Sequence, residues 1–195
     1  MTKENGHLFR YVDTACFEDN RVHLPPGSKP QYINASWIEY KAGPRAIATQ
    51  GPVPASVVSF LRMAAWVESP LILMPCRLKE NGQSKCEQYW PPPGKTALLE
   101  ELEVTLLSQE QVSPTVVRRR ISILRGKDKE RPPHELTHLQ YTGWPDWGLP
   151  EESEGVMFLV DEMLAVRKTS DKPVIVHCSA GVGRTGTVLA IALLK

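Results

Sequence analysis

The chain has 195 residues, which suits one domain with a substantial core and is short for two domains of typical size. Hydrophobic residues make up 42% and charged residues 23%, and the formal net charge of +1 gives no indication of nucleic-acid binding. No apolar run is long enough for a membrane span or a signal peptide, and the four cysteines lack metal-ligand spacing, so free thiols in a reducing, cytoplasmic compartment are expected.

The first two thirds of the chain are predicted to be rich in strands. Residues 33–38 and 45–49 have strand-like patterns, and 71–74 form a short apolar run that is typical of a buried strand. Residues 54–67 carry apolar side chains at helical spacing, with a proline near the start, where a helix tolerates it. Three alternating segments follow and are predicted to be antiparallel strands: 102–107, 116–124 and 135–141.

The last third predicts two helices and one strand. Residues 151–167 place five apolar side chains on one stripe of an amphipathic helix. Residues 173–176 are predicted to be a short buried strand, and 187–194 an apolar helix. Because strands and helices are interspersed, the predicted fold class is α/β of the mixed α+β kind, with a twisted, mostly mixed or antiparallel sheet flanked by helices.

The most basic stretch of the chain is Arg118-Arg119-Arg120. It lies within the alternating segment 116–124, so we expect it to form a solvated face of a strand rather than a binding patch. No nucleic-acid partner is therefore predicted.

The segment 177–186 reads HCSAGVGRTG and lies between the predicted strand 173–176 and the last predicted helix. A strand, a tight loop and a helix N-terminus in this order direct backbone N–H groups and the helix dipole at one anion. This positive field favours the thiolate form of Cys178, and the Arg184 guanidinium can bind two phosphate oxygens at once. The pattern predicts attack of a thiolate on a phosphoryl group. The amides that would hold this group belong to Ser179, Ala180, Gly181, Val182 and Gly183.

Each candidate residue also has a plainer interpretation when it is taken alone. A buried cysteine usually packs as a small inert hydrophobe, and an aspartate such as Asp146 often only opens a turn or a helix. Tyr11 alone would be interpreted as a half-buried aromatic, and Glu80 and Lys85 as ordinary hairpin charges. The preceding histidine, the two glycines between Cys178 and Arg184, and the strand–loop–helix context favour the catalytic interpretation of Cys178.

The segment 177–186 resembles the signature of the protein tyrosine phosphatases, and Trp144-Pro145-Asp146-Trp147-Gly148 resembles the mobile acid loop of that family. The resemblance implies that Asp146 protonates the leaving phenolate and later accepts a proton from the water that hydrolyses the phosphocysteine. It also implies that Thr185 hydrogen-bonds the sulfur of Cys178, that His177 supports the loop, and that no metal or cofactor takes part.

The segment 10–13, Arg-Tyr-Val-Asp, resembles the phosphotyrosine-recognition loop of the same family. The resemblance implies that Tyr11 stacks on the substrate ring, that Asp13 accepts hydrogen bonds from the substrate backbone, and that Asn34 holds the loop. Val12 stands where some members carry a basic residue, so a weakened preference for acidic residues beside the phosphotyrosine is our hypothesis. The predicted partners are phosphotyrosine-containing proteins.

The segment 80–90 resembles a further loop and strand pair of the family. The resemblance implies that Glu80 pairs with Arg184 and fixes its orientation, and that Lys85 approaches the closed acid loop.

The resemblance runs from about Phe9 to Leu194 and implies one non-receptor-like catalytic domain, residues 1–195, that lacks the C-terminal helices and the Gln-bearing loop of the family. Two functions stay open on this basis: a phosphatase that turns over, and a phosphotyrosine-binding module with little or no turnover. An arsenate-reductase-like or rhodanese-like thiolate site would leave Tyr11, Glu80 and Asp146 unexplained.

Overall fold

The computed structural model describes residues 3–39, 46–126 and 132–195. Its strands are β1 Ala35–Ile38, β2 Ala46–Thr49, β3 Leu71–Met74, β4 Lys79–Glu80, β5 Gln83–Ser84, β6 Thr96–Leu99, β7 Leu102–Ser113, β8 Val116–Arg125, β9 His134–Tyr141 and β10 Val174–His177. Its helices are α1 Val57–Trp66, α2 Ser153–Thr169 and α3 Gly183–Leu194, with short 3-10 turns η1 Lys3–Leu8, η2 Glu18–Asn20 and η3 Pro54–Ser56.

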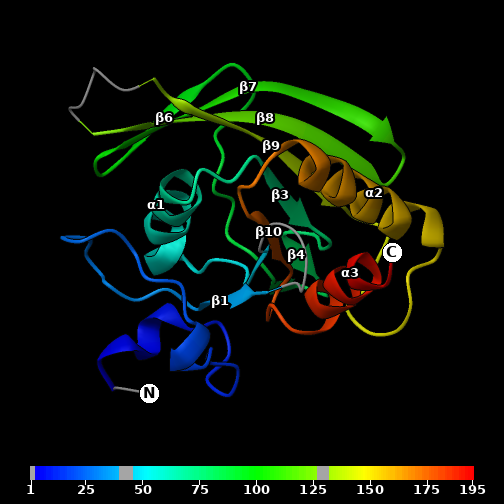
Figure 1. Ribbon diagram of the computed structural model, residues 1–195, viewed down its shortest axis with the longest axis horizontal. Coiled ribbons are helices and arrows are strands. Elements are labelled where there is room, and N and C mark those ends of the chain that lie inside the picture. Colours follow the sequence, from blue (N-terminus) through cyan, green and yellow to red (C-terminus); the bar gives the residue numbers. More distant parts are fainter. Residues whose placement is uncertain (1–2, 40–45, 127–131) are drawn as a thin grey trace.

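An eight-stranded mixed sheet forms the centre of the molecule, in the order β1-β2-β10-β3-β9-β8-β7-β6. The strands β4 and β5 form a separate hairpin. Figure 1 shows α1 on one side of the sheet and α2 and α3 on the other. The predicted fold class, a mixed sheet flanked by helices, is therefore confirmed.

The central strand β3 explains why its sequence is an uninterrupted apolar run. Ile72 and Met74 pack into the core that contains α1, whereas Leu71 and Leu73 pack into the core that contains α2 and α3. Successive side chains of a strand point to opposite faces, so a strand that is covered on both faces needs apolar residues at every position.

The helix α3 begins at Gly183, four residues before the predicted start at 187, so the predicted boundary is wrong. Gly183 and Gly186 have low helix propensity, so the sequence pattern placed the start of the helix after both of them. The Gly186 amide nevertheless donates to the Val182 carbonyl over 2.8 Å and closes the first helical turn. As a consequence Arg184 lies in the first turn of the helix.

Other boundaries differ where side chains are exposed. The strand β6 was not predicted, and β7 runs to residue 113 instead of 107. The β4–β5 hairpin was expected only from the resemblance of segment 80–90 to a strand pair, and not from its own pattern. These segments alternate poorly or lie largely in solvent, so hydrophobic periodicity gives little signal for them. Of the predicted strand 45–49, residue 45 lies outside the described residues.

The expected solvated face at 118–120 is wrong for Arg119, whose side chain is buried on the sheet face opposite α2. Its guanidinium carbon lies 4.4 Å from the centre of the Trp90 ring, and it donates to the side-chain oxygens of Gln109 and Gln140 over 2.8 and 3.1 Å. Alternation along β8 sends Arg119 to the face opposite that of Arg118, so it points to the Trp90 side, while Arg118 points to α2.

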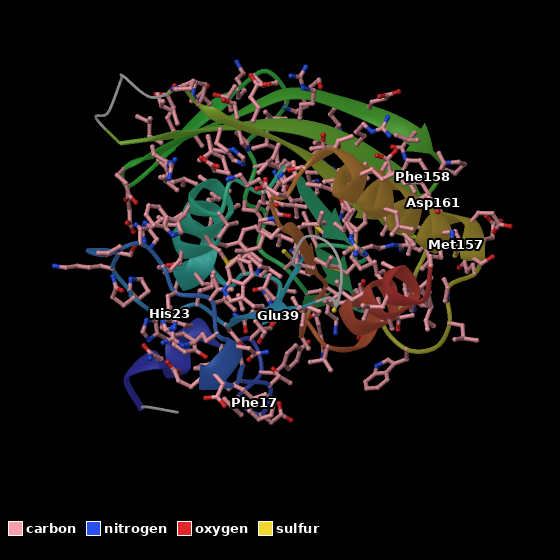
Figure 2. The ribbon with its side chains drawn as sticks, in the orientation of Figure 1. Phe17, His23, Glu39, Met157, Phe158 and Asp161 are labelled. Carbon is pink, nitrogen blue, oxygen red and sulfur yellow. The ribbon has the colours of Figure 1, made fainter. Side chains whose placement is uncertain are left out.

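Side chains of α2 tie this helix to its neighbours on two sides. Asp161 accepts a bond of 2.8 Å from the Lys195 ammonium after α3, while Glu162 accepts one of 2.8 Å from Arg118 of β8. Met157, Phe158 and Asp161 project from α2 in Figure 2. The middle of α2 is therefore held against both the sheet and the end of α3.

The strands β2, β10, β3 and β9 are neighbours and run parallel to one another. Their carboxyl ends consequently meet at one edge of the sheet, the usual place for a ligand site in such a sheet. The segments that follow these strands begin at residues 50, 178, 75 and 142. In the part of the chain that the structure describes, no helix is long and apolar enough to cross a membrane.

Candidate active site

The loop from Cys178 to Val182 joins β10 to α3 and is pressed against the end of β2. Gly181 has φ of 79°, and a side chain there would approach the Thr49 carbonyl oxygen to 2.5 Å. Gly51 donates to the Ser179 carbonyl over 2.9 Å, and a Cβ at Gly51 would lie 2.5 Å from the Cys178 carbonyl oxygen. Glycine at both positions lets two backbones approach closely and fixes the shape of the loop.

A cavity of about 860 Å³ opens in front of this loop. It brings together most of the candidate residues from distant parts of the sequence. Those that line it are Tyr11, Asp13, Lys85, Asp146, Cys178, Ser179, Ala180, Gly183 and Arg184. The thiol-bearing residue is only 3% exposed, so it lies at the bottom of the cavity.

The Arg184 guanidinium is fixed by the Glu80 carboxylate through two parallel bonds of 2.7 and 2.8 Å. Burial would lower the pKa of Arg184, but the hydrogen bonds and the charge of Glu80 outweigh it and raise this pKa. A bidentate pair of this kind holds the plane of the guanidinium, which then faces the site in one orientation.

The acid loop, which we define as residues 142–152, lies over the cavity. The Asp146 carboxylate contacts the Lys85 ammonium at 2.6 Å and the Arg184 guanidinium at 3.2 Å. The hydrogen bond to Asp146 raises the pKa of Lys85. Arg184 also donates to the Trp144 carbonyl over 3.2 Å, and the Trp144 indole donates to the Gly148 carbonyl over 3.2 Å. These contacts hold the loop over Cys178.

The segment 10–14 forms one wall of the cavity. The Tyr11 hydroxyl and the Ser179 hydroxyl are 3.0 Å apart and share a hydrogen bond. Asn34 donates to the Thr14 carbonyl over 3.0 Å and accepts from the Cys16 amide over 2.9 Å. The Asn34 side chain therefore holds the segment through its backbone, which is the contact that the resemblance implied.

Two further residues hold the same wall and were not assigned a contact from the sequence. Arg10 donates to the carbonyls of Gly51, Pro52 and Ser84 over 2.9, 2.6 and 2.9 Å. Gln50 donates to the Leu8 carbonyl over 2.7 Å and accepts from the Arg10 amide over 3.1 Å. Both residues lie within motifs that pointed to the family, but a motif does not reveal which backbone groups lie beside it.

His177 is buried beneath the loop, with Nδ1 3.2 Å from the Cys178 carbonyl and Nε2 2.9 Å from the Tyr89 hydroxyl. Since a carbonyl only accepts, Nδ1 carries the proton and Nε2 accepts from the tyrosine. Burial lowers the pKa of His177 to about 4, so the ring is neutral at pH 7. With both nitrogens engaged, the ring supports the loop. Tyr89 was not predicted to take part.

Thr185 is buried directly behind the loop, and its hydroxyl oxygen has no hydrogen-bond partner among the described residues. Its bond to the sulfur of Cys178 therefore stays a prediction. Within the described ranges no group of three or more His, Cys, Asp or Glu side chains is arranged to hold a metal ion.

Comparisons with known proteins agree with this geometry. A sequence profile described as Protein-tyrosine phosphatase matches residues 5–195. The Tyrosine-protein phosphatase Lar-like of Caenorhabditis elegans is 37% identical over 193 residues, which are 96% of this chain and 8% of that protein. The human Receptor-type tyrosine-protein phosphatase C is 36% identical over 191 residues, which are 96% of this chain and 14% of that protein.

Solved structures give the same result. The catalytic domain of human protein tyrosine phosphatase non-receptor type 18 superposes with a TM-score of 0.90 at 30% identity, covering 99% of this chain and 69% of that one. A structure of PTPN18 in complex with HER2-pY1248 phosphopeptides superposes with a TM-score of 0.89 at 30% identity, covering 98% and 72%. The chain spans only 8% to 15% of the length of the curated relatives that it matches.

Proposed function

Since the chain belongs to the protein tyrosine phosphatase family, we propose that it hydrolyses phosphotyrosine in proteins through a phosphocysteine intermediate. The observation that carries the proposal is the position of Cys178, Arg184 and Asp146 around one cavity, although Asp146 lies on a separate segment from the other two. This arrangement supplies a nucleophile, an anion clamp and a proton donor together.

In the proposed ground state the phosphate lies over the thiolate of Cys178. The amides of the loop 179–183 and the N-terminus of α3 bind its oxygens, because unpaired N–H groups and the helix dipole favour an anion there. Arg184, held by Glu80, binds two of these oxygens. The charge that develops on the phosphoryl group in the transition state is stabilised by donors already in place.

In the first step the Cys178 sulfur forms a bond to phosphorus while the bond between phosphorus and the tyrosyl oxygen breaks. The protonated Asp146 gives its proton to the departing oxygen, so a neutral phenol leaves. In the second step water attacks the phosphocysteine, Asp146 takes a proton from this water, and the thiolate departs. Thr185 is proposed to donate to the departing sulfur, because its hydroxyl has no other partner among the described residues.

Tyr11 and Asp13 are proposed to select phosphotyrosine. Both line the cavity together with the nucleophile, and the Tyr11 ring is anchored at the rim through Ser179. In this proposal the wall formed by Tyr11 makes the cavity too deep for a phosphoserine to reach Cys178, whereas the longer side chain of a phosphotyrosine reaches it. Phosphotyrosine-containing proteins are the proposed partners, as for PTPN18 with its phosphopeptides.

We further propose that residues 1–195 act as one catalytic domain in the cytoplasm. This location is supported by four cysteines that are all free thiols in the structure.

Quenched-flow measurement of a phosphotyrosine peptide tests the proposed function. Release of inorganic phosphate well beyond one equivalent per protein is expected. Release of at most one equivalent of dephosphorylated peptide, with no further phosphate, would instead identify a module that binds but does not turn over. A phosphoserine peptide of the same sequence serves as the specificity control, and its equal turnover would contradict the role of Tyr11.

A further inference from the structure

The acid loop is anchored at both of its ends. At the first end the Thr142 amide donates to the Thr115 carbonyl over 2.8 Å, and the Thr142 hydroxyl donates to the same oxygen over 3.2 Å. At the other end the Tyr141 hydroxyl donates to the Glu152 carbonyl over 3.1 Å. The position of Asp146 over the site therefore depends on how firmly these two ends are held.

A third contact at the first end comes from Arg77, a residue with no role in the site as described so far. Its Nε–H donates to the Thr142 carbonyl over 2.8 Å. The two segments also meet one step earlier, where the Gln140 side chain donates to the Cys76 carbonyl over 3.0 Å. The Arg77 side chain thus links the segment that follows β3 to the acid loop, which follows β9. The contact between the two chain segments therefore continues beyond the paired residues of both strands.

The backbone of Arg77 reaches the phosphate clamp as well. Its amide donates to Glu80 Oε1 over 3.0 Å, and the same oxygen accepts the 2.7 Å bond from Arg184. A small cavity of about 220 Å³ is lined by Arg77, Glu80, Trp144 and Asp146, so this residue lies directly behind the acid loop. One residue therefore contacts the acid loop through its side chain and the partner of the clamp through its backbone.

We propose that Arg77 is a positioning residue that holds the acid loop in register with the phosphate clamp, so that Asp146 meets the leaving oxygen. This inference rests on the proposed phosphatase function. The group that acts is the Nε–H donor and not the positive charge of Arg77, since the side chain is exposed and this donor bonds a carbonyl oxygen.

The sharpest test compares variants that separate the donor from the charge and from the length of the side chain. Arg77→Gln places an N–H at the same number of bonds from the backbone as Nε but carries no charge. Arg77→Met has the same reach without a donor. Both keep the backbone amide that bonds Glu80. Arg120→Met is the matched control, since this exposed arginine of β8 pairs with Glu135 of β9.

Two readouts are measured on each variant. The first is amide hydrogen exchange of residues 143–152, with β9 as the internal reference. The second is the slope of log kcat/KM against the pKa of the leaving phenol in a series of aryl phosphates, which steepens when the leaving oxygen is poorly protonated.

For Arg77→Met we expect faster exchange in the acid loop, a steeper slope, and kcat/KM on a phosphotyrosine peptide about 3- to 10-fold lower, as for loss of one hydrogen bond. Arg77→Gln should restore all three, and Arg120→Met should leave them unchanged. In an Asp146→Ala background Arg77→Met should add no further loss, because it acts through Asp146.

The proposal is overturned if Arg77→Met behaves as Arg120→Met does, if Arg77→Gln is as impaired as Arg77→Met, or if the loss persists in the Asp146→Ala background. A wild-type chain without turnover would contradict the proposed function alone. In that event the exchange data decide: faster exchange of the acid loop in Arg77→Met but not in Arg77→Gln supports the positioning role, and equal exchange refutes it.

Discussion

The phosphate-binding loop at 178–184 and the acid loop at 142–152 meet over one cavity but are held in different ways. The first is enclosed at both ends, where Cys178 is 3% and Arg184 8% exposed, although Val182 between them is 61% exposed. Glycines at 51 and 181 let it lie close against neighbouring backbone. The second is open: Trp147 is 86% and Leu149 83% exposed. The cradle for the anion is preorganised by packing, whereas the acid rests on a few polar contacts that can break and re-form. A catalyst needs both properties, because the substrate has to enter before the acid is brought to it.

The largest expected effect falls on the enclosed loop. Cys178→Ser should lower turnover of a phosphotyrosine peptide by at least about 1,000-fold, because a hydroxyl is a far weaker nucleophile than a thiolate at neutral pH. Binding of the peptide, measured by calorimetry, and the thermal unfolding midpoint should change little. Substantial activity in this variant would refute the assigned nucleophile.

The next largest effect is expected for a substitution in the acid loop, because this substitution should change kcat without changing peptide affinity. Asp146→Ala should lower kcat by about 100- to 10,000-fold, because the leaving phenolate loses its proton donor. The phosphate cradle is untouched, so peptide affinity should stay near that of the wild type. A loss of affinity as large as the loss in kcat would show that the acid loop also holds the phosphate in place.

The pH dependence of stability reports on the support beneath the enclosed loop. Burial lowers the pKa of His177 to about 4, below the value of about 6.5 expected in the unfolded chain. The unfolded chain therefore binds more protons between these values, and the free energy of unfolding falls by up to about 3 kcal/mol as pH drops from 6.5 to 4. Burial also lowers the pKa of His138, which acts in the same direction.

Chemical unfolding measured at pH 7 and at pH 4.5 checks this expectation, with His177→Gln as the comparison. The variant should show a smaller difference between the two pH values than the wild type. An equal difference would place the pH dependence elsewhere in the molecule.

The smallest expected effect compares one glycine from each loop. Gly181 and Gly148 both have positive φ, of 79° and 103°, but only at Gly181 would a Cβ clash with neighbouring backbone. Gly181→Ala should therefore lower the free energy of unfolding by about 1 to 3 kcal/mol and distort the anion site, whereas Gly148→Ala should cost about 1 kcal/mol. Urea unfolding of both variants measures the difference, and equal losses would show that the two loops are packed alike.

The sequence predicted those parts of the fold in which burial alone decides the pattern. Residues 71–74 and 173–176 were predicted as strands because both faces of each are covered. Burial of Arg119 was not predicted, because its partners Trp90, Gln109 and Gln140 come together only in the folded sheet. No local pattern distinguishes an arginine that faces solvent from one that faces such partners.

The same limit applies to the candidate site. Cys178 and Arg184 share one contiguous motif, and local chemistry was enough to assign them. Glu80 lies 104 residues from Arg184, and only the resemblance to a family paired them. Arg77 gave no signal at all, because its contact with Thr142 depends on two strand ends that meet at one edge of the sheet.

The strand order also has a consequence for how the chain reaches its native state. β10, which begins at Val174, is synthesised well over 90 residues after β3, which ends at Met74, yet it inserts between β2 and β3. Until it arrives, these two strands present unpaired edges that are prone to association with other chains. Cys178 directly follows this strand, so the nucleophile reaches its site only when the centre of the sheet closes. A nascent chain therefore cannot be active ahead of its folding, and chaperone dependence during synthesis is expected to centre on the β2–β3 gap.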